Sequence, residues 1–316
     1  MDDDGTGRYA ERITQIPLGG WKAILKRTYT QIGEDNLTLI AGGSTFFLLL
    51  AVFPALASFV ALYGLFFDTS DIAKQVEEMR GVVPASGLEL IEGELTRLVA
   101  QPAATLGVGF AISLLVSLWS ANAGMRTLFT AMNIAYGEEE KRGFFSRTLL
   151  SLSFTLMSIV AVAVLFLVIG GVPVLVDALP FSKGTETLVL LLRWPLLLLF
   201  VVVGLSVLYK YGPSRRPPRW RWLGWGTTLT ALLWLGVSAA FAFYLSRFAD
   251  YNATYGSLGA VVGFMMWLYV SLVVVLLGAE LNAEIEHQVA TDTTTGPYKP
   301  MGERGAHKAD RLPDAA

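Results

Sequence analysis

The sequence predicts an all-α membrane protein, a bundle of six transmembrane helices. The chain of 316 residues is 53% hydrophobic and only 16% charged, and its mean hydropathy is +0.53. A soluble protein of this length carries about 25% charged residues. A helix needs ~20 apolar residues to cross the hydrocarbon core, and uninterrupted runs are typical of helices because barrel strands alternate. Six stretches meet this length: Leu37–Tyr63, Leu106–Met125, Leu149–Val176, Leu188–Tyr209, Trp222–Leu245 and Leu258–Leu281.

Residues 1–36 are expected to form a cytoplasmic N-terminus with an interfacial amphipathic helix. Apolar and small side chains recur there at intervals of three and four residues, with cations between them: Leu18, Trp21, Leu25, Thr28, Tyr29 and Ile32, interleaved with Lys22, Lys26 and Arg27. Such a helix lies in the membrane interface with its cations toward anionic headgroups, or packs on the end of the bundle. No apolar run precedes Leu37, so the first span is expected to act as the insertion signal, without a cleavable signal peptide.

Residues 37–286 form the predicted six-span domain, and residues 68–101 are its one large external segment. Asp71–Arg80 and Ser86–Ala100 are each expected to be a short amphipathic helix. Carboxylates outnumber cations in this segment. That excess fits a vestibule that attracts cations, or a plain solvated face.

Proline and glycine positions within the spans allow two interpretations each. Pro54 and Pro195 lie in the first span of each half of the bundle, and we interpret them as helix breaks of the transporter type. Prolines that only line a bundle are the alternative. Gly259 and Gly263 form a GxxxG motif, which favours close helix packing and leaves a homo-oligomer open.

The positive-inside rule predicts that both termini are cytoplasmic. With the N-terminus inside, Lys and Arg are concentrated in the N-terminal segment, the second and fourth connections and the C-terminal tail, and few lie in the other connections. Residues 287–316 are rich in Thr, Gly, Pro and charged residues. We expect them to be a disordered cytoplasmic tail.

Ionisable and amide side chains inside the predicted spans are the candidate functional residues, because hydrocarbon penalises them unless they are paired. Asn122, Arg126 and Asn133 fall on one face of a helix that is expected to continue to Tyr136. Glu280 and Glu284 share a face at the same depth as Arg126 in the sixth span. We predict an ion pair between Arg126 and Glu280, and a pathway or gate network formed by Asn122, Arg126, Asn133, Glu280, Asn282 and Glu284. The alternative is that the pair only clamps two helices or lies among headgroups.

The residue content disfavours an enzyme. Cysteine is absent, which excludes disulfides and thiolate sites, and the only histidines are His287 and His307. The sequence has no phosphate-binding loop, no nucleophile elbow and no H-E-x-x-H helix. We therefore predict no catalytic residues, no cofactor, no metal site and no nucleic-acid partner.

Several blocks of sequence carry a resemblance to a known family. They are Leu118–Ala121, Asn133–Tyr136, Tyr255–Gly259, Trp267–Tyr269 and Gly278–Asn282, together with Ala41–Pro54 and Leu208–Pro213. These blocks resemble the YihY/BrkB family of bacterial inner-membrane proteins, historically also labelled ribonuclease BN, from about Trp21 to Glu284. The resemblance implies a six-span protein of the bacterial cytoplasmic membrane, linked to virulence and suspected of transport. The nuclease label conflicts with the residue content described above.

We therefore expect a transporter or permease-like protein for a small solute, ion or lipid component, surrounded by the lipid bilayer. A gradient is the expected driving force, because the chain carries no ATP-binding loop. The alternative is a non-catalytic structural or assembly factor of the envelope that docks partners on residues 68–101. A membrane-embedded hydrolase or nuclease is disfavoured.

Overall fold

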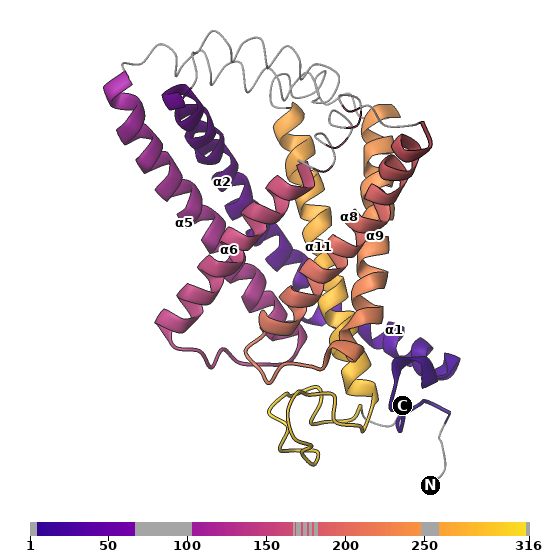
Figure 1. The fold of residues 1–316 in the computed structure, drawn as a ribbon. Coiled ribbons are helices and arrows are strands. Elements are labelled where there is room, and N and C mark those ends of the chain that lie inside the picture. Colours follow the sequence, from indigo (N-terminus) through magenta and orange to yellow (C-terminus); the bar gives the residue numbers. More distant parts are fainter. Residues whose placement is uncertain are drawn as a thin grey trace. The chain divides into compact units, whose positions relative to one another are not determined.

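The computed structural model describes residues 5–66, 103–166, 183–247 and 259–313, with residues 168, 172, 176 and 179. This part of the chain is helical apart from its connections, the segment before α1 and the tail after α11, and it contains one isolated β-bridge, between Pro218 and Thr294. Its elements are η1 (Ile13–Gln15), α1 (Leu18–Glu34), α2 (Leu37–Phe66), α5 (Ala103–Ala135), α6 (Phe144–Phe166), α8 (Lys183–Tyr211), α9 (Trp220–Arg247) and α11 (Gly259–Gln288) (Figure 1). The all-α prediction is confirmed for these residues. The two helices predicted within residues 68–101 lie outside them.

Four described helical segments are long and apolar enough to cross a membrane. They are Phe144–Ala161, Lys183–Tyr211, Trp220–Leu245 and Val261–Gln288. Leu18–Glu34 and Leu37–Val52 together qualify as a fifth span, with a bend of 61° between them. The described residues therefore support four or five spans, and the six-span count stays a prediction.

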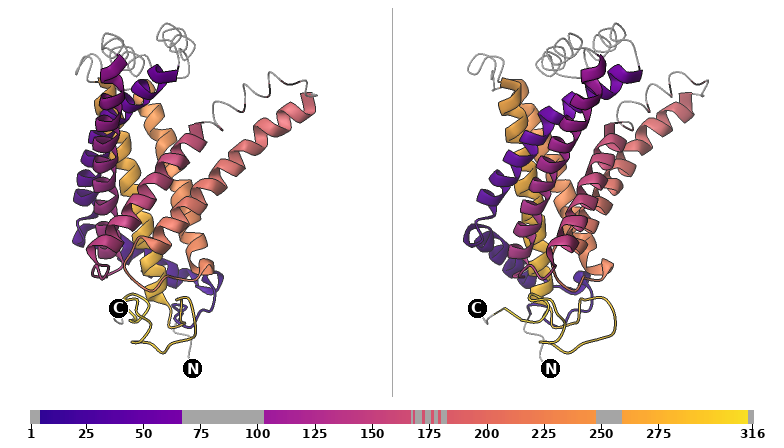
Figure 2. Two further views of the ribbon diagram at one scale, coloured as in Figure 1. Left: turned by 60° about the vertical axis from the view of Figure 1, so that its left-hand side comes forward. Right: turned by 90° about the vertical axis from the view of Figure 1, so that its left-hand side faces the viewer.

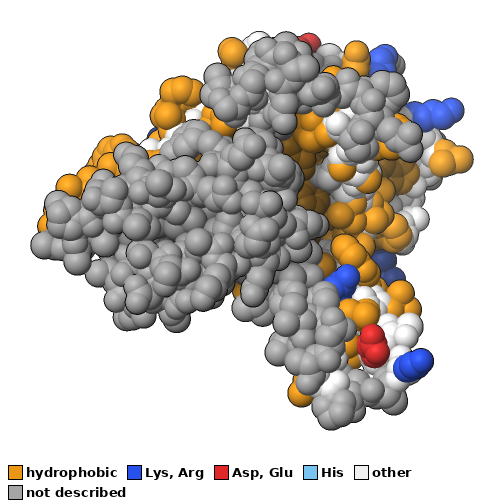
Figure 3. All heavy atoms as spheres, turned by 90° about the horizontal axis from the view of Figure 1, so that it is seen from above, with side chains coloured by type: hydrophobic (Ala, Val, Ile, Leu, Met, Phe, Trp, Pro, Cys, Tyr) orange, Lys and Arg blue, Asp and Glu red, His pale blue; other side chains and the backbone are white. Residues whose placement is uncertain are grey.

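The flanks of these helices expose hydrophobic side chains. On α8, Leu191 and Leu196 are 65% and 61% exposed, and hydrophobic side chains cover much of the described surface visible in Figure 3. Water penalises apolar patches of this extent, whereas lipid accepts them. The helices therefore have the surface of a membrane protein.

The chain divides into two compact units, which we describe separately. Unit 1 comprises Met1–Ala41, Arg126–Val237 and Ser271–Ala316, and unit 2 comprises Gly42–Met125 and Ser238–Val270. In unit 2, Ser117 on α5 donates a hydrogen bond to the carbonyl of Ala51 on α2, over 3.0 Å. A Cβ at Gly124 would lie 3.2 Å from the Leu48 side chain, so this glycine allows α5 to approach α2.

Neither proline that was expected to break a helix does so. Pro54 lies inside α2 and Pro195 inside α8, and both helices continue past them. The break lies between α1 and α2 instead, where Asn36 has a φ of 52°. A proline removes one hydrogen bond and kinks a helix, and membrane helices tolerate this because neighbouring groups satisfy the freed carbonyl. A residue in the left-handed region changes the chain direction, and asparagine is one of the few residues that adopts it readily.

The core of unit 1 joins both ends of the chain. The N-terminal segment, α1 and the start of α9 pack around the end of α11, and Trp21 packs against the cluster that they form: Ala10, Ile13, Ile16, Ile24, Trp222, Leu281, Ile285 and Val289. In Figures 1 and 2 the described N-terminal segment (indigo) and the tail (yellow) accordingly both lie at the end of α11. On α1 the buried residues are Gly20, Ile24 and Thr28, while Leu18, Leu25 and Tyr29 are exposed. The helix is present as predicted, and its place in a lipid interface stays a prediction.

The C-terminal tail differs from the expected disorder. The Arg304 side chain is buried and donates hydrogen bonds to the carbonyls of Ala290 and Ala309, each over 2.6 Å. Main-chain hydrogen bonds tie the tail to other segments of unit 1: Ala290 N to Arg8 O, Arg219 N to Thr293 O, Thr295 N to Pro217 O and Arg216 N to Gly305 O. Composition predicted disorder because the tail has little apolar surface to bury. Hydrogen bonds from the backbone and one guanidinium hold it instead, and composition does not reveal these.

Gly278 is expected to tolerate no side chain. A Cβ there would overlap the hydroxyl groups of Thr230 on α9 and Tyr209 on α8, both of which are buried. Gly278→Ala should therefore destabilise the protein by about 1–3 kcal/mol, as overpacking does. Gly224, on the exposed side of α9, has open space around it, and Gly224→Ala should be neutral or stabilising. Thermal unfolding in detergent measures both, and an equal midpoint for the two variants would contradict this packing.

Candidate functional site

Three carboxylates are buried at the end of α11. Glu280, Glu284 and Glu286 are each at most 1% exposed. A buried carboxylate is costly unless it is paired and hydrogen-bonded. The three side chains therefore require cations from other elements, and the structure shows where these come from.

Glu284 is held by two cations from opposite ends of the chain. Arg27 Nε on α1 lies 2.5 Å from Glu284 Oε2, and Lys308 Nζ in the tail lies 2.5 Å from Glu284 Oε1. Arg27 also donates to Gln288, one turn further along α11, over 2.7 Å. Glu284 thus joins α1, α11 and the tail.

Glu280 lies one turn before Glu284 on the same face of α11 and is less well satisfied. It is 0% exposed, and neither of its carboxylate oxygens accepts a hydrogen bond within the part of the chain that the structure describes. Its ion-pair partner there is Lys308, whose Nζ lies 3.9 Å from Oε1. The nearby Asn282 donates to Gly278 O over 2.8 Å, but its own Oδ1 is buried without a hydrogen-bond partner. Buried polar atoms without partners are uncommon in folded proteins, so each requires an explanation.

Glu286 points to another side of α11 and forms the best-paired contact of the cluster. Arg215, in the loop after α8, donates to it twice, over 2.8 and 2.6 Å, and the two side chains are 0% and 1% exposed. The Arg215 guanidinium also lies over the ring of Tyr136, 4.1 Å from its centroid. Thr293 in the tail donates to the same carboxylate over 3.1 Å.

Asn133 connects α5 to the two loops beside this cluster. Its side chain donates to Glu140 over 3.1 Å and accepts from the main chain of Ser214 over 2.7 Å. Gly137, with a φ of 65°, ends α5 in a Schellman motif and lets the loop turn back toward Glu140. Burial opposes the charged form of Glu140, but hydrogen bonds from Arg142 outweigh burial and lower its pKa to about 2.

The predicted network is only partly assembled. Unit 1 brings together Glu280, Glu284 and Asn282, and it places Asn133 in the neighbouring loop contacts. The predicted ion pair between Arg126 and Glu280 is not formed: Arg126 donates to Thr148 on α6 over 2.9 Å, and Glu280 has Lys308 beside it. Helix periodicity gave the face of Arg126 but not the neighbouring helix toward which its long side chain extends.

Asn122 belongs to unit 2 and is therefore not placed against this cluster. It is buried, and its Oδ1 has no hydrogen-bond partner among the residues that the structure describes.

The sequence reasoning missed the cations that compensate these carboxylates: Arg27, Arg215 and Lys308. Arg27 was interpreted as a cation of the amphipathic helix that faces lipid headgroups or the end of the bundle, Arg215 counted only toward the topology as part of the fourth connection, and Lys308 lies in the tail for which disorder was expected. The sequence feature that could have indicated these cations is the presence of Glu280, Glu284 and Glu286 at one helix end, because three buried carboxylates require cations from other elements. No group of three or more His, Asp or Glu side chains is placed to hold a metal in the described ranges.

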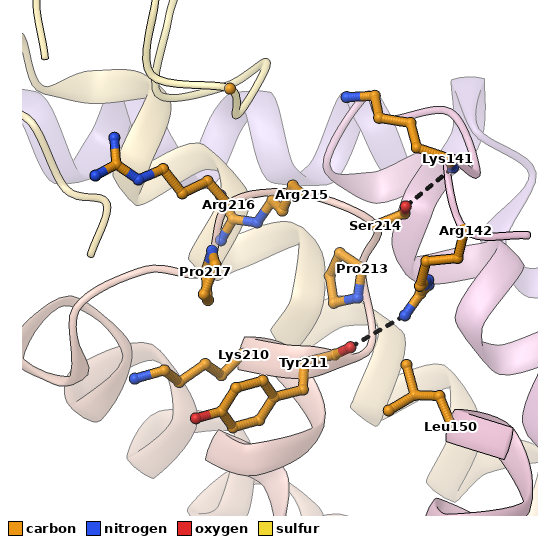
Figure 4. Close-up of a pocket in the computed structure, with 11 residues that line it drawn as sticks. Lys141, Arg142, Leu150, Lys210, Tyr211, Pro213, Ser214, Arg215, Arg216 and Pro217 are labelled. Carbon is orange, nitrogen blue, oxygen red and sulfur yellow. Dashed lines mark hydrogen bonds between the residues drawn. The ribbon is translucent and has the colours of Figure 1, made fainter. Parts of the chain in front are cut away.

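A basic cavity of about 520 Å³ shares Arg215 with this cluster (Figure 4). Five cations and six other residues line it, from the connections after α5 and α8, from α6, from the end of α8 and from the tail: Lys141, Arg142, Leu150, Lys210, Tyr211, Pro213, Ser214, Arg215, Arg216, Pro217 and Gly305. In Figure 4, Lys210 and Arg216 lie on one side of the cavity, and Lys141 and Arg142 lie on the other. The sequence showed this region only as a basic loop.

Acidification is expected to loosen the tail. Burial opposes the charged form of Asp292, but hydrogen bonds from Thr294 and Lys299 outweigh burial and lower its pKa. The pKa of His307 is also lowered, by burial and by the nearby positive charge of Arg311. Groups with lowered pKa values contribute stability at neutral pH that is lost as the pH falls. Asp35, whose pKa is raised by burial, acts in the opposite sense and opposes part of this loss. The loss should therefore begin below about pH 6.5, the ordinary pKa of histidine, and deepen below about pH 4 as Asp292 is protonated.

A spin label on Tyr298→Cys, an exposed site in the tail, measures this loosening. The chain has no other cysteine, so the label is specific. Its spectrum should sharpen between pH 6.5 and 3, and Asp292→Asn should remove the part of the change below about pH 4. A spectrum that stays constant over this range would show that these groups do not hold the tail.

Comparison with known proteins places this chain in a family. A family model described as Virulence factor BrkB matches residues 28–301. The chain belongs to this family. The match confirms the resemblance found in the sequence, and it covers α2, α5, α6, α8, α9 and α11 together with the start of the tail.

Relatives of this BrkB-family chain are found in several bacteria. YfkH of Bacillus subtilis (strain 168), named as a ribonuclease-like protein, is 30% identical over 75% of this chain and 86% of its own length. A UPF0761 membrane protein of Cronobacter sakazakii is 27% identical over 94% of this chain and 95% of its own length. Another, from Verminephrobacter eiseniae, is 29% identical over 85% of this chain, which spans 64% of that longer relative. No solved structure matches the chain.

These comparisons and the apolar helices identify a membrane protein of the BrkB and UPF0761 family. The family description carries no catalytic name, and the ribonuclease-like name belongs to the Bacillus relative.

Proposed function

We propose that this protein is a transporter or permease-like protein of the bacterial cytoplasmic membrane for a small solute, ion or lipid component. The observation that carries the proposal is the state of Glu280. It is a fully buried carboxylate on a helix able to cross a membrane, without a hydrogen bond to either oxygen in the described part of the chain. An ionisable group in such a helix is by default a candidate for a substrate, ion or proton pathway. A purely structural carboxylate would be expected to have its hydrogen bonds satisfied.

The charges around Glu280 support a gate. Lys308 bridges Glu280 and Glu284, and it comes from the tail rather than from another span. A tail segment can move away more readily than a packed helix, and its departure would leave Glu280 without this cation. In this proposal Glu280 exchanges a proton or an ion when Lys308 withdraws, and Lys308 closes the path when it returns. Both termini and this gate then lie on the cytoplasmic side.

Flux in liposomes tests the proposal. Purified protein is reconstituted with a pH or ion reporter inside the vesicles, and a gradient is imposed. The wild-type chain should give flux above that of empty vesicles, and Glu280→Gln should lower it by at least about tenfold if the carboxylate carries the coupling. Glu139→Gln, at an exposed site in the loop after α5, is the matched control and should retain the flux.

The alternative is a structural or assembly role in the envelope. The buried Arg215–Glu286 pair favours it, because a doubly hydrogen-bonded pair between a loop and a helix can serve as a clamp. In that case no gradient would produce flux, and Glu280→Gln would change only stability. Folded wild-type protein without flux under any imposed gradient would therefore reject the transport proposal.

A further inference from the structure

The positive charge around Glu280 falls short of the negative charge. Three carboxylates act on one another at the end of α11: Glu280 and Glu284 on the helix, and Asp35 at the break between α1 and α2. The cations beside them are Arg27 from α1 and Lys308 from the tail. Three carboxylates therefore share two cations in this part of the described structure.

The two cations are distributed unevenly between the buried carboxylates. Both donate hydrogen bonds to Glu284, Arg27 from its Nε and Lys308 from its Nζ, each over 2.5 Å. Glu280 has only the Lys308 ammonium beside it, 3.9 Å from Oε1 and beyond hydrogen-bond distance. His287, 3.4 Å from Glu284, adds a positive charge only when it is protonated, and it adds that charge at Glu284. The shortfall of positive charge therefore falls on Glu280.

A proton suits Glu280 better than a metal cation does. A buried carboxylate whose charge is not compensated becomes neutral by binding a proton. A hard metal cation instead needs several oxygen ligands around it. No group of three or more His, Asp or Glu side chains is placed to provide them in the segments that the structure describes. The Lys308 ammonium also contacts both Glu280 and Glu284, and it would repel a metal ion there.

We propose that the ion bound by Glu280 is a proton, which replaces Lys308 as the compensating positive charge when Lys308 withdraws. The inference rests on the proposed function, because it names the ion that the proposed gate admits. The proton comes from water and forms an O–H bond with one Glu280 oxygen. When Lys308 returns, this bond breaks and the proton leaves to water. Glu280 is thus accompanied by an ammonium in one state and is neutral in the other.

Infrared difference spectroscopy of the full-length protein in lipid vesicles tests the proposal. A protonated carboxyl group has a carbonyl stretching band that a carboxylate lacks. The buffer is stepped from about pH 9 to about pH 6, a range in which exposed carboxyl groups stay ionised. The wild-type chain should gain this band, Glu280→Gln should lack it, and Glu139→Gln, at an exposed position, should retain it. In a second arm sodium or potassium is added at constant pH, and the carboxylate bands should not change.

Two results in these arms would overturn the proposal. One is a pH step that gives the same spectrum in the wild type and in Glu280→Gln. The other is a change in the carboxylate bands on addition of sodium or potassium that Glu280→Gln abolishes, since it would assign a metal cation to this carboxylate.

Lys308→Met tests the exchange between proton and ammonium. A nearby ammonium favours the carboxylate, so its removal should raise the pH midpoint of the band by about one unit or more. Lys299→Met, at an exposed position of the same tail, should leave the midpoint unchanged. Equal midpoints in the two variants would overturn the exchange. The band is recorded without a gradient, so a protein that shows it but gives no flux would reject the proposed transport and retain the proton site.

Discussion

Arg215→Ala is expected to destabilise the protein more than any other single change considered. The guanidinium donates two hydrogen bonds to Glu286, stacks on Tyr136, and has a side chain that is 0% exposed. Its removal leaves a carboxylate buried without its cation, which costs roughly 3–5 kcal/mol. Thermal unfolding in detergent, scored against the wild type, should show a large fall in midpoint.

Two further variants separate the ion pair from general effects of charge. Arg221→Ala, at an exposed position in the first turn of α9, should change stability by no more than about 0.5 kcal/mol. The double variant Arg215→Leu with Glu286→Leu should recover much of the loss, because apolar residues of similar volume often replace a buried pair without cost. An Arg215→Ala midpoint equal to that of Arg221→Ala would mean that the pair contributes nothing to the fold.

Lys308→Met is expected to have the second-largest effect. It leaves Glu284 with Arg27 and, when protonated, His287 as ion-pair partners in the described structure, and it removes the only ion pair of Glu280 there. Loss of a charge-assisted hydrogen bond in a buried site costs about 1.5–3 kcal/mol. Lys299→Met, at an exposed position of the same tail, is the matched control and should be close to neutral.

A double-mutant cycle identifies the carboxylate responsible. If Glu280 is the group left uncompensated, Lys308→Met should cost less in a Glu280→Gln background, because a neutral amide needs no cation. Additive losses in the cycle would place the whole effect at Glu284. Equal stability of Lys308→Met and Lys299→Met would exclude Lys308 as a compensating charge for either carboxylate.

Much of the fold could be predicted because length and hydrophobicity alone determine a membrane helix. The apolar runs at Leu188–Tyr209 and Trp222–Leu245 differ from α8 and α9 by only a few residues at each end. The helical face of Asn133 was also predictable, since a polar residue on an apolar helix turns away from lipid, and Asn133 is buried. The six-span count stays a prediction, because the described residues support four or five spans and part of the predicted spans lies outside these residues.

The pairing of charges could not be predicted, because it depends on contacts distant in sequence. Glu284 meets Arg27 across 257 positions, and no local pattern connects the two. The role of Lys308 was not predicted, because the tail that contains it has a composition typical of disorder. In the structure, Arg304 and Asp292 hold this tail through hydrogen bonds to the main chain. Arg126 donates to Thr148 rather than pairing with Glu280, since an expected depth does not determine which neighbouring helix a long side chain reaches.

The proposed gate is tested most directly by the access of water-soluble reagents to position 280. The chain has no cysteine, so Glu280→Cys can be labelled specifically in membrane vesicles with a small thiosulfonate reagent. With Lys308 present the labelling should be slow, and Lys308→Met in the same background should raise its rate at least about tenfold, because the tail then no longer closes the path. Lys299→Met should leave the slow rate unchanged. Equal labelling rates with and without Lys308 would contradict a gate formed by the tail.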